Sequence, residues 1–303
     1  IDASTTVKGV VEAATSAEIN ADTATGGTGA ALAITPDQLA LSKYTTFGGD
    51  GSDGALTITS GTTTIDCANA AVVVKNYTSI SITGTGNLAF TNPNTNGTVI
   101  VLKSQGAVTL TSSSSAVIDL RNMGGAAGAV NVDGTAGYSN NILQSGGGVK
   151  GTGAAGSGGT VSLFLTQQDL YLSRYAGLTV GGGGGGPQTG ATGAGGRGAG
   201  SLIIECNGAF NFTTGTITAA GTIGTSGTGG IGGSGGSGSV YIWYKTLTAN
   251  SGTITVSSTA GLGTGGGSFA GGGGGAGAAS GGAGSGANTG GAGGAGISSV
   301  RKI

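Results

Sequence analysis

Glycine is the feature of this sequence that most limits what the chain can fold into. It occupies 72 of 303 positions, mostly after residue 121, in runs such as GGGGGGPQTGATGAGGRGAG at residues 181–200. Glycine loses more backbone freedom on folding than any other residue. The lost backbone entropy costs about 1–2 kcal/mol per residue. Runs of glycine therefore become ordered only where many backbone hydrogen bonds offset this cost.

The glycine runs keep phase with short segments that read as strands. Segments that open with glycine and a hydroxyl residue lead into aliphatic runs at Gly97, Gly159, Gly200 and Gly238. The pattern predicts a second strand after each of them, at 107–110, 169–172, 215–218 and 252–255, and a final strand at 297–301. Between the strand pairs lie glycine-rich excursions at 122–159, 181–200, 219–238 and 261–296. A collagen triple helix is excluded, because there is no strict Gly-x-y period and the chain has three prolines.

The stretch from about residue 50 to 121 alternates apolar and small polar residues with period two, which is typical of half-buried strands. Its Val, Ile and Thr residues suit a pleated surface. These patterns predict an all-β fold, a β-solenoid-like stack of short strands whose glycine-rich excursions pack as polyglycine II helices. A β-sandwich is the alternative for the strands, and mobile loops are the alternative for the excursions.

The first part of the chain has a different composition. TSAE at 15–18 has the form of a helix capping box, and TPDQ at 35–38 repeats it with Pro36 at the first helical position. We therefore expect a small N-terminal segment with short helices, which are too short to be stable without partners. Three parts follow: an attachment segment at 1–48, a strand-rich solenoid-like region at 49–121, and a glycine-rich β-repeat region at 122–303.

Two stretches resemble a known family. STTVKGVVEAATSAEINA followed by ALAITPDQLA, from Ser4 to Leu41, resembles the short repeat of bacteriophage tail fibres. The matching positions are Gly9, Val10, Ala14, Glu18, Thr35, Pro36 and Leu39. The late glycine runs resemble the tip adhesins of T-even-like phages, whose glycine motifs pack as polyglycine II and whose loops bind host receptors. The resemblance implies a protein of the virion tail, usually a homotrimer, whose C-terminal end meets the host. Because the chain begins at Ile1 and its single methionine is Met123, we expect it to be the C-terminal part of a longer product.

Charge and residue types narrow the possible functions. The formal net charge is -1 and 8% of residues are charged, which argues against nucleic-acid binding. The chain contains no run of about 18 apolar residues, which is the length that would suggest membrane insertion. There is no histidine, which removes the commonest general base and metal ligand. Cys67 and Cys206 lie far apart in apolar stretches, so we predict buried thiols, with a disulfide or a reactive thiol as the alternative.

No catalytic, metal or cofactor site is predicted. The acids of the central and later regions are scattered, at Asp119, Asp133, Asp169 and Glu205. A capsule depolymerase would need two carboxyl groups about 5–10 Å apart, and nothing in the spacing supports such a pair. The expectation is a protein that is not an enzyme.

Receptor contacts are expected on loop tips above a rigid scaffold. The candidate receptor-binding residues are the least glycine-like ones in the excursions: Tyr138, Asn140, Asn141, Gln144, Gln188, Arg197 and Phe269. For each of them a purely structural role is the alternative. A further possibility is the segment VYIWYKT, which places Tyr241 and Trp243 on one face of a strand, where they would either stack on a sugar ring or cover the glycine-rich part.

The sequence therefore predicts the distal part of a phage tail fibre, a receptor-binding adhesin of the virion tail. Its partner would be an outer-membrane protein or a polysaccharide of a bacterial surface, bound non-covalently by a homotrimer assembled through the N-terminal segment. Three alternatives stay open: a fibre shaft or cap without its own receptor site, a capsule depolymerase, and an ice-binding protein.

Overall fold

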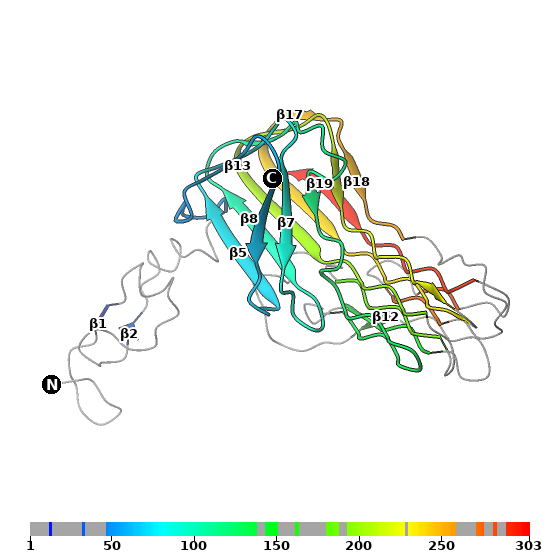
Figure 1. Ribbon diagram of the computed structural model, residues 1–303. Coiled ribbons are helices and arrows are strands. Elements are labelled where there is room, and N and C mark those ends of the chain that lie inside the picture. The colour runs from blue at the N-terminus through cyan, green and yellow to red at the C-terminus, as the bar shows by residue number, and fades with distance from the viewer. Residues whose placement is uncertain are drawn as a thin grey trace, which may run out of the picture.

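Parallel β-sheets make up the folded body of this chain. The computed structural model describes residues 12–13, 32–33, 47–137, 143–150, 161–163, 180–187, 193–227, 230–258, 271–275, 281–283 and 289–303. Among these residues there is no helix, and the larger strands belong to two sheets (Figure 1). Every strand pairing within those two sheets is parallel.

The smaller of these sheets has five strands in the order β18-β14-β10-β7-β4. Its members are β4 (Thr62–Asp66), β7 (Asn87–Thr91), β10 (Ile118–Asp119), β14 (Thr216–Thr218) and β18 (Thr253–Thr255). One row of the register aligns Leu88, Ile118, Ile217 and Ile254. Because side chains in one row of a sheet point to the same face, this row supplies an aliphatic stripe to the core.

The larger sheet has eight strands, and β13 holds it together. It comprises β3 (Ala55–Ile58), β5 (Val72–Tyr77), β6 (Ser79–Ile82), β8 (Val99–Ser104), β9 (Val108–Leu110), β13 (Ser201–Phe212), β17 (Val240–Asn250) and β19 (Ser298–Lys302). The first half of β13 pairs with β8, and its last residues pair with β9. From Leu202 to Phe212 it pairs with β17, with register shifts between Cys206 and Ala209 and between Phe210 and Asn211.

Three short pairings complete the list. β1 (Glu12–Ala13) and β2 (Leu32–Ala33) are parallel, whereas β11 (Leu143–Ser145) with β12 (Val161–Leu163) and β15 (Ser226–Gly227) with β16 (Gly230–Ile231) are antiparallel.

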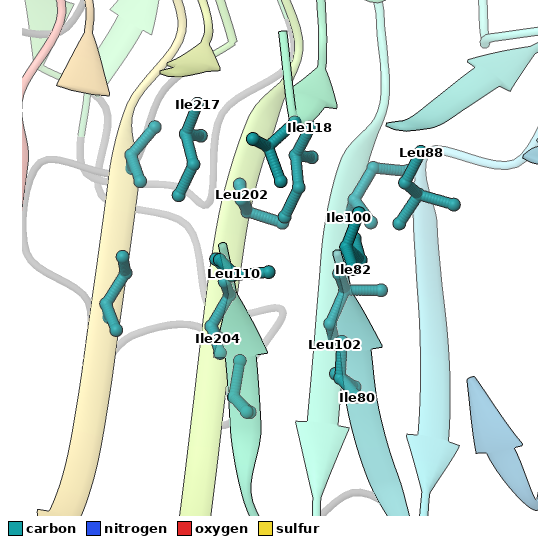
Figure 2. Close-up of a cluster of buried hydrophobic side chains, with 14 of the residues drawn as sticks. Ile80, Ile82, Leu88, Ile100, Leu102, Leu110, Ile118, Leu202, Ile204 and Ile217 are labelled. Carbon is teal, nitrogen blue, oxygen red and sulfur yellow. The ribbon is translucent and has the colours of Figure 1, made fainter. Parts of the chain in front are cut away.

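The main core is formed by side chains from both large sheets. Figure 2 shows its labelled members: Ile80, Ile82, Leu88, Ile100, Leu102, Leu110, Ile118, Leu202, Ile204 and Ile217. All of them are fully or almost fully buried. Full burial of one such side chain contributes about 1.5–3 kcal/mol, so this cluster is the principal source of stability for the sheets.

The opposite face of β8 and β13 is also buried. Val99, Val101, Val180, Ile203 and Tyr241 form a second apolar cluster there. Strands buried on both faces are expected to read as continuous aliphatic runs rather than alternating ones. VIVL in β8 and LII in β13 have this form.

The predicted fold class, a β-solenoid-like stack of short strands, is wrong. Two parallel sheets are found instead, and β13 and β17 run for 12 and 11 residues. β13 continues past Gly208, and its register against β17 shifts between Cys206 and Ala209 and again between Phe210 and Asn211. The alternative β-sandwich is not found either, because such sandwiches are built from antiparallel sheets.

The predicted equivalence of the second strands is also corrected. Val108–Leu110 pairs with the end of β13, and the partner of Thr216–Thr218 is Ile118–Asp119. The segment after Gly159 does not join the ladder, because Val161–Leu163 pairs with Leu143–Ser145 in a separate antiparallel pair. The two predicted helix starts at 15–18 and 35–38 lie outside the described residues.

Candidate functional site

The glycine-rich segments extend beyond the ends of the strands and lie side by side (Figure 1). We name this assembly the glycine bundle. It comprises residues 124–136, 146–149, 181–187, 193–200, 219–225, 230–238, 271–275, 281–282 and 289–296. The run Gly181–Gly186 follows buried Val180 and occupies the middle of the assembly, so we call it the hub.

Hydrogen bonds donated by the hub repeat every third residue. No described bond joins two hub residues, and successive N–H groups donate to three different neighbouring runs at 2.8–2.9 Å. The donor and acceptor residues are Gly181 to Ala199, Gly182 to Gly275, Gly183 to Thr135, Gly184 to Gly196, Gly185 to Gly272, and Gly186 to Val132. A three-residue repeat without internal bonds is the geometry of an extended three-fold chain.

Carbonyl groups of the hub bind three further runs. The oxygens of Gly181 and Gly184 accept from Gly125 and Gly128. Those of Gly182 and Gly185 accept from Gly236 and Gly233, and that of Gly183 accepts from Gly148. Six neighbouring runs therefore surround the hub, at 125–128, 132–135, 146–149, 196–199, 233–236 and 272–275. At about 1 kcal/mol for each hydrogen bond, two bonds per residue offset the large entropic cost of ordering glycine.

The hub requires glycine because its neighbours leave no room for a side chain, and not because of its backbone angles. A Cβ at any hub position would collide with a carbonyl oxygen of a neighbouring run, for example Ala126 O at Gly183 and Gly233 O at Gly184. None of the six hub residues has a φ angle in the left-handed region. The chains therefore pack at a distance that leaves no room for a side chain.

Three exposed apolar side chains lie on the surface of the bundle. Val132 and Ile223 are 50% and 54% exposed, and Val149 is 40% exposed. Val132 belongs to a turn closed by its N–H and Ala129 O, and its own carbonyl accepts from Gly186 at the end of the hub away from Val180. The far end of the hub therefore lies beside a turn that carries an exposed apolar side chain, whereas Ile223 lies on the run 219–225.

Arg197 is the one predicted contact residue whose side chain the structure describes, and it is bound internally. Its Nε donates to Gly124 O at 3.2 Å and its Nη2 to Asn94 O at 3.5 Å. Burial lowers the pKa of the guanidinium. Arg197 therefore joins a bundle run to the loop before β8, which is the structural role left open by the sequence.

Other predicted contact residues are not brought together by the described structure. The backbone of Gln144 pairs with Ser162 in the β11–β12 sheet. Tyr138, Asn140, Asn141, Gln188 and Phe269 lie outside the described residues. Ala136 O accepts from Asn96 Nδ2 at 3.0 Å, which joins the bundle run 124–136 to the loop before β8.

The face of β17 that carries Tyr241 and Trp243 packs against other apolar side chains of the protein. Tyr241 belongs to the second apolar cluster, and Trp243 packs against it. Burial raises the pKa of Tyr241. Tyr241 therefore supports the sheet and offers no surface for a sugar ring.

A buried polar row crosses β5, β8 and β13. The register places Asn76 beside Lys103 and Lys103 beside Glu205. Lys103 Nζ lies 3.3 Å from Glu205 Oε2, and both side chains are fully buried. The Asn76 side chain is 98% buried, and its Oδ1 accepts no hydrogen bond from the described residues. Glu205 is an isolated acid in the sequence, and the row was not predicted, although a charge inside each of two aliphatic runs was its signal.

A tight turn closes over this row. Gly48 N donates to Glu205 Oε2 at 3.1 Å. Gly48 and Gly49 have φ angles of +79° and +74°, and a Cβ on Gly49 would collide with Asn76 Oδ1. Glycine is needed here for both conformation and close approach. We refer to Asn76, Lys103 and Glu205 under this turn as the buried triad.

The remaining described acids and thiols form no centre. Asp119 binds Arg121 through both carboxylate oxygens, and Asp133 accepts from Lys150 N. Cys67 and Cys206 are unpaired and buried, as predicted. No group of three metal-binding side chains occurs in the part of the chain that the structure describes.

Comparison with known proteins adds no relative. No protein-family model matches the chain, and neither a curated protein nor a solved structure matches it. The described residues contain no helix with the length and apolar character needed to span a membrane.

Proposed function

We propose that this chain is the distal part of a bacteriophage tail fibre and acts as a receptor-binding adhesin. The observation that carries the proposal is the hub, a run hydrogen-bonded to six neighbours and packed too closely for side chains. Such a bundle is a rigid support, and binding residues are commonly held on loops above rigid supports. The tail-fibre resemblance between residues 4 and 41 supplies the biological context.

Contacts would come from the exposed side chains of the bundle, including those of the turn at its far end. Exposed Val132 in that turn and exposed Ile223 on the run 219–225 give the bundle surface an apolar character that the glycine residues lack. Exposed apolar residues gathered on one part of a surface favour a protein or carbohydrate partner. The partner we propose is a bacterial surface structure, an outer-membrane protein or a polysaccharide, bound by a homotrimer on the virion tail.

A binding role is favoured over a hydrolytic one by the state of the described acids. Asp119 is held by Arg121, and Glu205 is fully buried beside Lys103. A glycosidase needs two carboxyl groups that both reach the substrate. Neither of these two acids meets that condition.

Binding of the labelled protein to whole bacteria tests the proposal. A panel of host strains would be incubated with wild-type protein and with Val132→Asp and Ile223→Asp variants. We expect a double variant that carries both substitutions to bind cells at least tenfold more weakly than the wild-type protein. Leu247→Asp is the control, because Leu247 is 46% exposed on β17 of the sheet body.

Other outcomes assign the alternatives. Absence of binding to every strain by the native oligomer would favour a shaft or cap segment. Release of reducing ends from capsule would favour a depolymerase. Equal loss of binding in the Leu247→Asp control would place the contact surface on the sheets and overturn the assignment to the bundle surface.

A further inference from the structure

The buried triad has the composition of a self-catalysed cross-link site. It holds a primary amine, a carboxamide and a carboxyl group, all removed from solvent. Burying an ion pair and an amide oxygen that lacks a hydrogen bond costs stability, and such a group in a native fold calls for an explanation. We propose that Lys103 and Asn76 form an intramolecular isopeptide bond, with Glu205 as the proton carrier.

Placement of the two reacting groups follows from the strand register. Asn76 and Lys103 are direct partners on adjacent parallel strands, so their side chains leave the same face about 4.8 Å apart. Four rotatable bonds let the lysine amine reach the neighbouring carboxamide carbon. Glu205 lies on the other side of Lys103, in the same row and in contact with Nζ.

The reaction needs no added reagent. Lys103 Nζ passes a proton to Glu205, and its lone pair then forms a bond to Asn76 Cγ. Glu205 next gives its proton to Nδ2 and takes a second proton from Nζ. Cleavage of the Cγ–Nδ2 bond releases ammonia, which leaves with the proton that Glu205 holds. Lysine and asparagine are thereby converted to one amide and one ammonium ion, with no change in oxidation state.

The covering turn protects this chemistry from water. Gly48 donates to the Glu205 carboxyl group, and Gly49 lies against Asn76 Oδ1 and Lys103 Cβ. Water at this position would compete with the amine for the carboxamide carbon. Exclusion of water leaves the amine as the available nucleophile.

Mass spectrometry of the denatured full-length protein tests the proposal. We expect an intact mass lower than that of the sequence by one ammonia. Trypsin cannot cleave after an acylated lysine, so the digest should contain the peptide 76–121 in place of 76–103 and 104–121. Cleavage after the neighbouring Lys75, which is partly exposed and paired with Asp53, is the internal control.

Variants assign the roles. Glu205→Gln and Asn76→Ala should show no loss of ammonia and should cleave normally after Lys103, with an unchanged circular dichroism spectrum as the check on folding. Asn207→Ala removes one of the two other buried amide oxygens without a partner, the second being that of Asn211, and should still form the bond. A wild-type protein of full mass that is cleaved after Lys103 overturns the proposal, as does a cross-link that maps to Asn207. These results are independent of the cell-binding assay.

Discussion

Glycine serves two different physical purposes in this chain at the scale of the residue. Gly48 and Gly49 adopt left-handed backbone angles that other residues disfavour. Hub glycines have ordinary angles and are required because neighbouring carbonyl oxygens fill the space of a Cβ. Substitution at the two kinds of position should therefore fail for different reasons.

Gly183→Ala tests the packing of the hub. The added methyl group would collide with Ala126 O and separate runs that are joined by backbone hydrogen bonds. We expect a loss of about 3 kcal/mol in the free energy of unfolding, at the upper end of the usual cost of overpacking. Urea denaturation measures this value.

Gly282→Ala is the matched control. The nearest atom to a Cβ at Gly282 is Ala292 N at 3.3 Å, and the backbone angle there is not left-handed. Its cost should stay below about 1 kcal/mol. Equal effects of the two substitutions would show that the hub is not the tightly packed centre of the bundle.

Alkaline pH should destabilise the fold through buried acids. Burial, followed by the charge of Asp66, raises the pKa of the Cys67 thiol from 9.0 to about 11. Burial, followed by the charge of Asp53, raises the pKa of Tyr77 from 10.0 to about 12. The unfolded chain therefore releases these protons first, and the free energy of unfolding falls as the pH rises from 9 toward 12.

Denaturant unfolding at pH 8 and at pH 11 checks this expectation. The double variant Cys67→Ala, Tyr77→Phe lacks both groups and should lose less stability between the two pH values than the wild-type protein. An identical loss in the variant would assign the alkaline sensitivity to the lysines instead.

At the scale of the element, β13 is the strand on which most of the fold depends. Two shorter strands pair with the same side of β13: β8 pairs with its first half, and β9 pairs with its last residues. β13 also contributes to both apolar clusters, through Leu202 and Ile204 on one face and Ile203 on the other. A change in this strand affects more of the fold than a change in any edge strand.

Ile203→Ala tests this role. Ile203 is fully buried between Val101 of β8 and Tyr241 of β17 in the register. Truncation of such a side chain costs about 2–5 kcal/mol, including the cavity left behind. Leu247→Ala on the exposed part of β17 should cost less than about 1 kcal/mol. Thermal or urea unfolding of the two variants gives the comparison.

Local patterns predict strand positions well but not strand partners. Ile217 and Ile254 lie in predicted strands and align in the structure, because both segments share the pattern Thr-Ile-Thr. The join between β8 and β13 was not predictable, since about a hundred residues of mostly glycine-rich chain separate them. The buried triad escaped prediction for the same reason. Its members lie together only after β5, β8 and β13 come into register.

The bundle and the sheets are covalently continuous at the scale of the whole molecule. The run that ends at Gly200 leads directly into β13, and the run that ends at Gly238 leads through Ser239 into β17. Ordered glycine runs therefore extend the central strands instead of hanging from them. The two parts should unfold together.

Hydrogen exchange tests that expectation. Amides of Gly181–Gly186 are all donors to neighbouring runs, so they should exchange as slowly as those of β13. Residues of β4, an edge strand with mostly exposed side chains, should exchange faster. Complete exchange of the hub at the shortest labelling time would contradict an ordered bundle.

The six-fold surroundings of the hub also determine how the molecule responds to a mechanical load. Its hydrogen bonds lie across the direction in which the runs extend, so a pull along the runs shears many of them at once rather than opening them one by one. Force applied at the turns is shared among seven runs and passes directly into β13 and β17. Strength against tension therefore comes from the number of backbone hydrogen bonds that are loaded in parallel.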